Sequence, residues 1–150
     1  MRTYLVIVDE TEEAALALRF AARRAAATGG GVQLLALVPK QAFNAFGGVQ
    51  ATIEQEARDR AEVLANGAAG SVLSDAGRMP KIGVRVGDAK TEVTAYLKDH
   101  PEVSALVLGA AKEGNPGPLV THFSASPGSL PCPMIVVPGG MDPDRLDALS

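Results

Sequence analysis

The sequence predicts an α/β fold, an open parallel β-sheet with helices on both faces. Short apolar runs alternate along the chain with longer segments whose apolar residues recur at helical spacing. Most of these runs are continuously apolar, which is typical of parallel strands buried on both faces. Alternation of such strands with helices predicts a doubly wound sheet. With 150 residues, 47% of them hydrophobic, the chain has the length and the apolar content of one domain.

The first three predicted elements are a strand, a helix and a second strand. Residues 4–8 form a β-branched apolar run typical of a buried strand. Asp9 or Thr11 can cap the helix predicted over residues 12–27, because their side-chain oxygens can accept hydrogen bonds from unpaired amides of its first turn. Residues 32–38 then predict the second strand.

The middle of the chain predicts a linker, a long helix and a third strand. Residues 41–50 are predicted to be an irregular linker, in which Phe43 and Phe46 either pack over the sheet edge or form a lid or partner contact. Residues 52–74, rich in Ala, Glu and Arg, predict a long helix. The alternating apolar residues of segment 82–86 predict the third strand.

The C-terminal part continues the alternation. Its predicted elements are a helix at 91–99, a strand at 103–108, a short helix at 119–125 and a strand at 134–137. A polar loop rich in Gly and Pro separates the fourth strand from the short helix. Residues 139–150 are polar and predict a loosely held tail that follows a domain of residues 1–138.

Composition and charge argue against several classes of protein. One Cys excludes an intramolecular disulfide framework and a Cys-rich zinc module, and two His leave little material for a His-rich metal site. A formal net charge of −3 argues against a nucleic-acid partner, which would require a basic surface. No leader peptide is recognisable and no apolar run reaches about 18 residues, so we expect a cytoplasmic protein with no membrane partner.

The candidate binding residues follow the predicted strands. In open parallel sheets, ligands bind beyond the carboxyl ends of the strands, where the strand order reverses. Asp9 and Thr11 follow the first strand, Val38 ends the second, and a Gly-rich loop follows the fourth. A carboxylate can accept from an adenine amino group or a ribose hydroxyl, and loop amides can bind phosphates. The pattern therefore predicts a nucleotide site, although helix capping and turn formation are competing interpretations of the same residues.

Four segments resemble motifs of the universal stress protein family. Residues 6–11 resemble its first-strand V-D-G-S segment, 86–88 its G-D turn, 106–109 its V-M-G strand, and 130–137 its closing A-P-C-P-V-L-V-V. The resemblance covers about residues 3–138. It implies a Rossmann-like five-stranded parallel sheet of order 3-2-1-4-5, as in the adenine nucleotide alpha hydrolases.

The resemblance also implies a homodimer that pairs through the last strand. The residues of that predicted edge are Met134, Ile135, Val136 and Val137. An exposed apolar strand edge promotes association, and antiparallel pairing with a second copy would remove it.

Family members that bind ATP resemble G-x2-G-x9-G-[S/T] after the fourth strand. Gly109 matches the first glycine, but Lys112 stands in place of the second, and Val120 and Thr121 stand where the G-[S/T] pair is expected. The loop is two residues shorter than the motif, 11 positions against 13. Lys112 could instead meet a phosphate as a point charge. The candidate nucleotide-binding residues are Asp9, Thr11, Val38, Gly109, Lys112, Gly114, Gly117 and Thr121.

Two functional hypotheses stay open at this point. In the first, the protein binds an adenine nucleotide such as ATP or AMP, with Mg²⁺ as a candidate companion ion, and acts as a stress-response dimer. In the second, the altered loop has abolished nucleotide binding, and the protein acts through contacts with an unknown protein partner. We expect no enzyme, because no nucleophile, general base or metal cluster is recognisable, although slow ATP hydrolysis stays open. Cys132 is expected to be an inert packed thiol.

Overall fold

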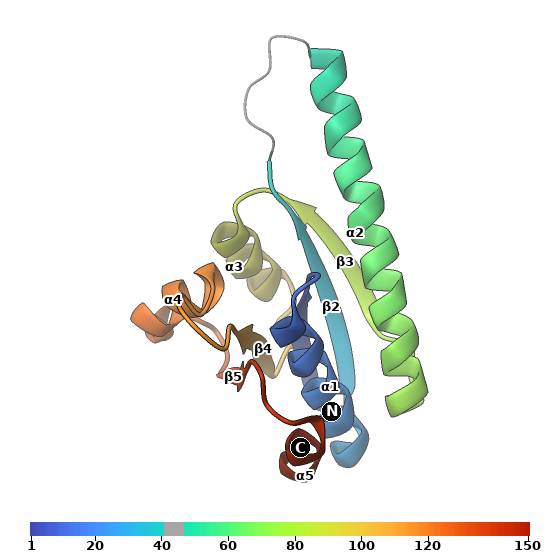
Figure 1. The fold of residues 1–150 in the computed structure, drawn as a ribbon, viewed down its shortest axis with the longest axis vertical. Coiled ribbons are helices and arrows are strands. Elements are labelled where there is room, and N and C mark those ends of the chain that lie inside the picture. Colours follow the sequence, from blue (N-terminus) through green and yellow to red (C-terminus); the bar gives the residue numbers. More distant parts are fainter. Residues whose placement is uncertain (41–46) are drawn as a thin grey trace.

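The computed structural model describes residues 1–40 and 47–150, and the side chains of the second stretch from residue 51 onward. It contains the predicted five-stranded parallel sheet in the order β3-β2-β1-β4-β5 (Figure 1). The segment with Phe43 and Phe46, predicted as edge packing, lid or partner contact, lies outside the described residues.

All neighbouring strands of the sheet are parallel. The strands are β1 (Thr3–Val8), β2 (Gly31–Val38), β3 (Lys81–Val86), β4 (Ala105–Ala110) and β5 (Met134–Pro138). The chain proceeds from β1 through β2 to β3 in one direction and adds β4 and β5 on the other side of β1. The strand order therefore reverses between β1 and β4, which is where an open α/β sheet leaves a crevice.

Helices cover both faces of the sheet. They are α1 (Glu12–Thr28), α2 (Gly47–Ala76), α3 (Ala89–Asp99), α4 (Pro118–Ala125) and α5 (Pro143–Leu149), with a 3₁₀ turn at Pro127–Ser129. One face carries α1, α2 and α5, and the other carries α3 and α4. A helix of 30 residues is about 45 Å long, whereas a strand of eight is about 26 Å, so α2 extends beyond the sheet (Figure 1).

The core has two layers because successive side chains of a strand point to opposite faces. Val6 of β1 is fully buried among α1 and α2, and its neighbour Leu5 is fully buried toward α3 and α4. Ala17, Ala21 and Ala25 form the buried face of α1. Their small side chains let this helix approach the sheet closely.

A buried polar chain links β2 to α3. The Tyr96 hydroxyl donates to Oε1 of Gln33 at 2.7 Å, and Nε2 of Gln33 donates to Oε1 of Glu102 at 3.2 Å. Tyr96 and Gln33 are both buried, and burial raises the pKa of the Tyr96 hydroxyl. The phenol therefore stays protonated and remains a donor, so each buried group of the pair has a partner.

Two boundaries differ from the sequence prediction. The predicted linker at 41–50 is wrong for residues 47–50, which belong to α2. The first turn of a helix has no intrahelical partners for its amides, so glycines there cost little once the following residues propagate the helix. The fourth strand is β4 rather than 103–108, because the Val103 amide donates to the His100 carbonyl in the turn after α3. Pairing with β5 extends β4 through Gly109 and Ala110.

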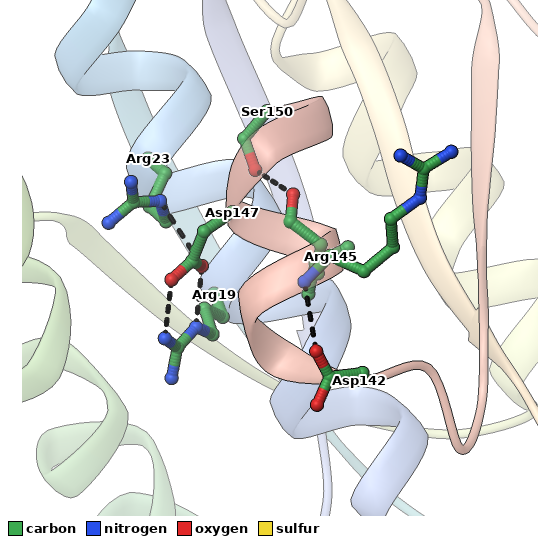
Figure 2. A network of polar contacts seen from close by, with 7 residues as sticks. Arg19, Arg23, Asp142, Arg145, Asp147 and Ser150 are labelled. Atoms are coloured by element: carbon green, nitrogen blue, oxygen red, sulfur yellow. Dashed lines mark hydrogen bonds and ion pairs between the residues drawn. The ribbon is translucent and has the colours of Figure 1, made fainter.

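The expectation of a loosely held C-terminal tail is also wrong. Residues 143–149 form α5, and Leu146 is buried in the core cluster that contains α1. Figure 2 shows Asp147 of α5 between two arginines of α1: Arg19 donates through Nε to Oδ1 at 2.7 Å and through Nη2 to Oδ2 at 2.6 Å, and Nε of Arg23 lies 3.2 Å from Oδ1. Asp142 caps the helix by accepting from the Arg145 amide. The tail is therefore attached by the apolar packing of Met141 and Leu146 and by one ionic cluster.

Candidate functional site

A cavity of about 410 Å³ lies at the carboxyl ends of β1, β2 and β4. Its apolar wall is formed by Ile7, Leu37 and Leu108, one residue from each of these strands, and the beginnings of α1, α3 and α4 border it. Asp9 and Glu13 are its acidic lining residues. The cavity thus occupies the point where the strand order reverses and combines an apolar wall with few polar groups, as ligand sites do.

A larger hollow of about 700 Å³ lies between α1, α2 and the segment leading into α5. It is more open, and Glu12, Arg19 and Asp75 lie among its lining residues. None of its described lining residues belongs to a strand, whereas the ligand-binding sites of parallel sheets lie at the carboxyl ends of the strands. We therefore take the smaller cavity as the candidate site.

The Asp9 carboxylate is held at the cavity by the cap of α1. Asp9 Oδ1 accepts from the Thr11 amide at 2.8 Å and from the Thr11 hydroxyl at 2.5 Å. Thr11 Oγ1 in turn accepts from the Ala14 amide at 3.1 Å, so Thr11, not Asp9, is the N-cap residue. These contacts use one oxygen of the carboxylate. Because a carboxylate has about four acceptor positions, Asp9 keeps capacity for a ligand.

Gly109 brings α1 and β4 together. It lies within β4 and lines the cavity, and a Cβ added to it would lie 2.1 Å from the Glu13 carbonyl oxygen. Any side chain at this position would push α1 off the sheet. The same close approach places Glu13, in the first turn of α1, in the lining of the cavity.

The loop between β4 and α4 is held by its own hydrogen bonds. The Ala111 amide donates to the Pro116 carbonyl at 3.0 Å, and the Gly117 amide donates to Oδ1 of Asn115 at 2.8 Å. The Thr121 hydroxyl donates to the same Asn115 oxygen at 3.2 Å. Gly117 adopts a φ of 125°, which favours glycine.

The structure brings half of the predicted nucleotide-binding residues into the cavity. Asp9, Thr11, Gly109 and Gly117 line it, whereas Val38, Lys112, Gly114 and Thr121 are outside its lining. The Val38 side chain is buried, and its carbonyl accepts from the Gly87 amide at 3.0 Å. The aliphatic carbons of Lys112 lie against Gly140, where an added Cβ would be 2.6 Å from Lys112 Cδ.

Other lining residues were not among the sequence candidates. Strand alternation could have identified Ile7, Leu37 and Leu108, because each lies near the end of its strand on the face of α3 and α4. Glu13 carried no such signal, because its position depends on how closely α1 packs at Gly109. Val120, which stands where the motif has glycine, is buried and lines the cavity.

The charged groups at the cavity are acidic. Of the described residues that line it, Asp9 and Glu13 are acidic and none is Lys or Arg. Asp88 next to the cavity caps α3, and the hydrogen bond from the Thr91 hydroxyl lowers the pKa of its carboxyl. Within the part of the chain that the structure describes, no three His, Cys, Asp or Glu side chains gather where they could hold a metal ion. Nor does any helix in residues 1–40 and 47–150 combine the length and apolar character of a membrane span.

Cys132 lies away from these polar groups. It packs at the edge of the core layer of α3 and α4, and partial burial raises the pKa of its thiol. A thiol with a raised pKa has little thiolate at neutral pH, which makes it a poor nucleophile.

Comparison with protein families gives one match that spans nearly the whole chain. The sequence profile of the universal stress protein family matches residues 1–138. No curated protein matches the sequence.

Solved structures show the same fold. The universal stress protein UspA from Lactobacillus plantarum has a TM-score of 0.78 at 22% identity, covering 91% of this chain and 97% of that one. A universal stress protein family protein from Arabidopsis thaliana with AMP bound has a TM-score of 0.63 at 12% identity, covering 96% and 99%. The universal stress protein from Archaeoglobus fulgidus in complex with dAMP has a TM-score of 0.55 at 17% identity, covering 91% and 97%.

Proposed function

The chain belongs to the universal stress protein family, and from this premise we propose that it binds an adenine nucleotide in the cavity at the carboxyl ends of β1 and β4. It acts as a non-catalytic stress-response protein of the cytoplasm. The observation that carries the proposal is that the Asp9 carboxylate lies beside an apolar wall of Ile7, Leu37 and Leu108. An apolar wall suits an adenine ring, and the carboxylate suits its amino group or a ribose hydroxyl.

The structural relatives support adenine as the recognised group. Their ligands are AMP in the Arabidopsis thaliana protein, dAMP in the Archaeoglobus fulgidus protein and cAMP in a further universal stress protein. These ligands share adenine and a single phosphate. For the present chain we propose the same base, bound against the wall of the three strands.

Replacement of Asp9 tests the proposal directly. Binding of AMP is measured by isothermal titration calorimetry for the wild type, for Asp9→Ala and for Glu10→Ala. Loss of a hydrogen bond to a charged group should weaken AMP binding by about tenfold or more in Asp9→Ala. Glu10 is the matched control, because it is the adjacent exposed acid and is outside the cavity lining. Equal affinity in both variants and the wild type would remove Asp9 from the site.

We also propose that the protein is a homodimer paired through β5. This strand is last in the sheet order, and Val136 on it is 38% exposed. Antiparallel pairing of two β5 strands would join the sheets and cover this edge. Light scattering after size exclusion should give twice the chain mass for the wild type and the chain mass for Val136→Lys. Val63→Lys on α2, where Val63 is 73% exposed, is the control and should stay dimeric. A wild type that is monomeric at high concentration would refute the dimer.

A further inference from the structure

We propose that the cavity selects adenosine and its monophosphate over ATP, and that Glu13 sets this selectivity. The proposal rests on the proposed function, since it concerns which adenine compound the same cavity accepts. The residues present suit an adenosine group but not a triphosphate. Three independent features of the described residues lead to this conclusion.

The first feature is the shortage of available amides in the segment from the end of β4 to the first turn of α4. Phosphates bind to free N–H groups of loops and of helix beginnings. Of the lining residues from the end of β4 to the first position of α4, Pro116 and Pro118 have no N–H, and the amides of Ala111 and Gly117 donate within the loop. The Thr121 amide already donates to the Gly117 carbonyl. In the first turn of α4 only the second and third positions retain amides of their own for a ligand.

The second feature is steric. The third position of α4 is Val120, which is buried and lines the cavity with its side chain. A Cβ and two methyl groups therefore stand where a glycine would let a phosphate approach the backbone. This side chain therefore hinders the approach of a phosphate to the Val120 amide.

The third feature is charge. Asp9 and Glu13 line the cavity, and among its described lining residues there is no Lys or Arg to offset them. Lys112, the nearest candidate cation in the sequence motif, packs its carbons over Gly140, which lines the larger hollow beside α1 instead. A ligand with several phosphate charges would be repelled here, whereas an uncharged nucleoside would not. In this proposal the Asp9 carboxylate also forms a hydrogen bond with adenosine. The charge of Glu13 has no such role, and its only effect is to disfavour ligands that carry phosphate.

Titration of a charge series tests the selectivity. Adenosine, AMP and ATP are titrated into the nucleotide-free protein at low salt and without Mg²⁺. We expect the Kd to rise in that order, with ATP about tenfold or more weaker than adenosine. Raising NaCl from about 0.05 M to about 0.5 M should narrow the gap, because salt screens repulsion between charges. Adding Mg²⁺ should narrow it too, since the ion neutralises part of the ATP charge.

Glu13→Gln isolates the residue. It removes one charge with little change of shape, and we expect the ratio of the ATP and adenosine Kd values to fall by about threefold or more. Glu12→Gln is the matched control: it removes a neighbouring charge from the same helix turn, so any loss of helix stability is shared, but Glu12 is outside the cavity. Its Kd ratio should stay near that of the wild type.

Each outcome separates the two proposals. An ATP Kd equal to or below that of adenosine at low salt overturns the selectivity while leaving adenine binding intact. A Kd ratio that is the same in Glu13→Gln and the wild type overturns the role of Glu13. Failure of adenosine, AMP and ATP alike to bind overturns the proposed function itself.

Discussion

Replacement of Leu146 by Ala tests whether the last helix is part of the folded domain. Leu146 is 2% exposed and packs in the core layer of α1. Substitution of a buried Leu by Ala costs about 2–5 kcal/mol, and a short terminal helix can move inward to fill part of the space. We therefore expect a loss of about 2–3 kcal/mol in the free energy of unfolding. For a chain of this length, that corresponds to a fall in Tm of about 5–10 °C.

The assay is urea unfolding followed by circular dichroism, with Leu149→Ala as the matched control. Leu149 lies on the same helix but is 51% exposed, so its truncation should change stability by no more than about 0.5 kcal/mol. The two substitutions remove the same atoms and differ in burial alone. Equal losses in the two variants would refute the packing of α5 on α1.

Three further predictions concern packing, a buried hydrogen bond and pH. Gly109→Ala should lower the free energy of unfolding by about 1–3 kcal/mol in thermal unfolding and should also weaken ligand binding. The reason is that the new methyl group would displace the Glu13 backbone and with it the cavity wall. Unchanged stability and unchanged affinity would contradict the close packing. Tyr96→Phe should cost about 1–3 kcal/mol in urea unfolding, because it leaves the buried Gln33 oxygen without its donor, whereas a neutral effect would mean that Gln33 finds another partner. The hydrogen bond from Arg19 lowers the pKa of the Asp147 carboxyl. The stability that this ion pair contributes is therefore complete above the ordinary pKa of an aspartate, and it is lost as the pH falls through the lowered pKa of Asp147. Asp147→Asn should thus lower Tm at neutral pH and match the wild type in strong acid; a constant difference across the pH range would count against the ion pair.

The local sequence pattern was sufficient to locate all five strands to within about two residues. Continuous apolar runs identified the strands that are buried on both faces, such as β1 and β2, and alternation of apolar residues identified β3. The pattern was insufficient for α5, in which Leu146 is the one buried residue. Seven residues with one buried position carry too little periodicity to distinguish a docked helix from a tail.

The sequence likewise placed some residues of the candidate site correctly and others not. Asp9 and Thr11 follow a strand directly, so chain connectivity alone places them at the carboxyl edge of the sheet. Lys112 in the loop and Thr121 in α4 are far enough from the end of β4 that hydrogen bonds and packing decide their positions, and both are outside the cavity lining.

The sequence by itself determined the parallel α/β architecture, the edge of the sheet at which the candidate site lies and the loss of two motif glycines. Only the tertiary structure decided which groups face that site. The close approach of α1 to Gly109 places Glu13 in the lining of the cavity, and Asn115 and the prolines between β4 and α4 leave few loop amides free for a phosphate. The physical reason is that periodicity and connectivity act along the chain, whereas the charge and hydrogen-bonding capacity of a cavity are set by segments that meet only after packing.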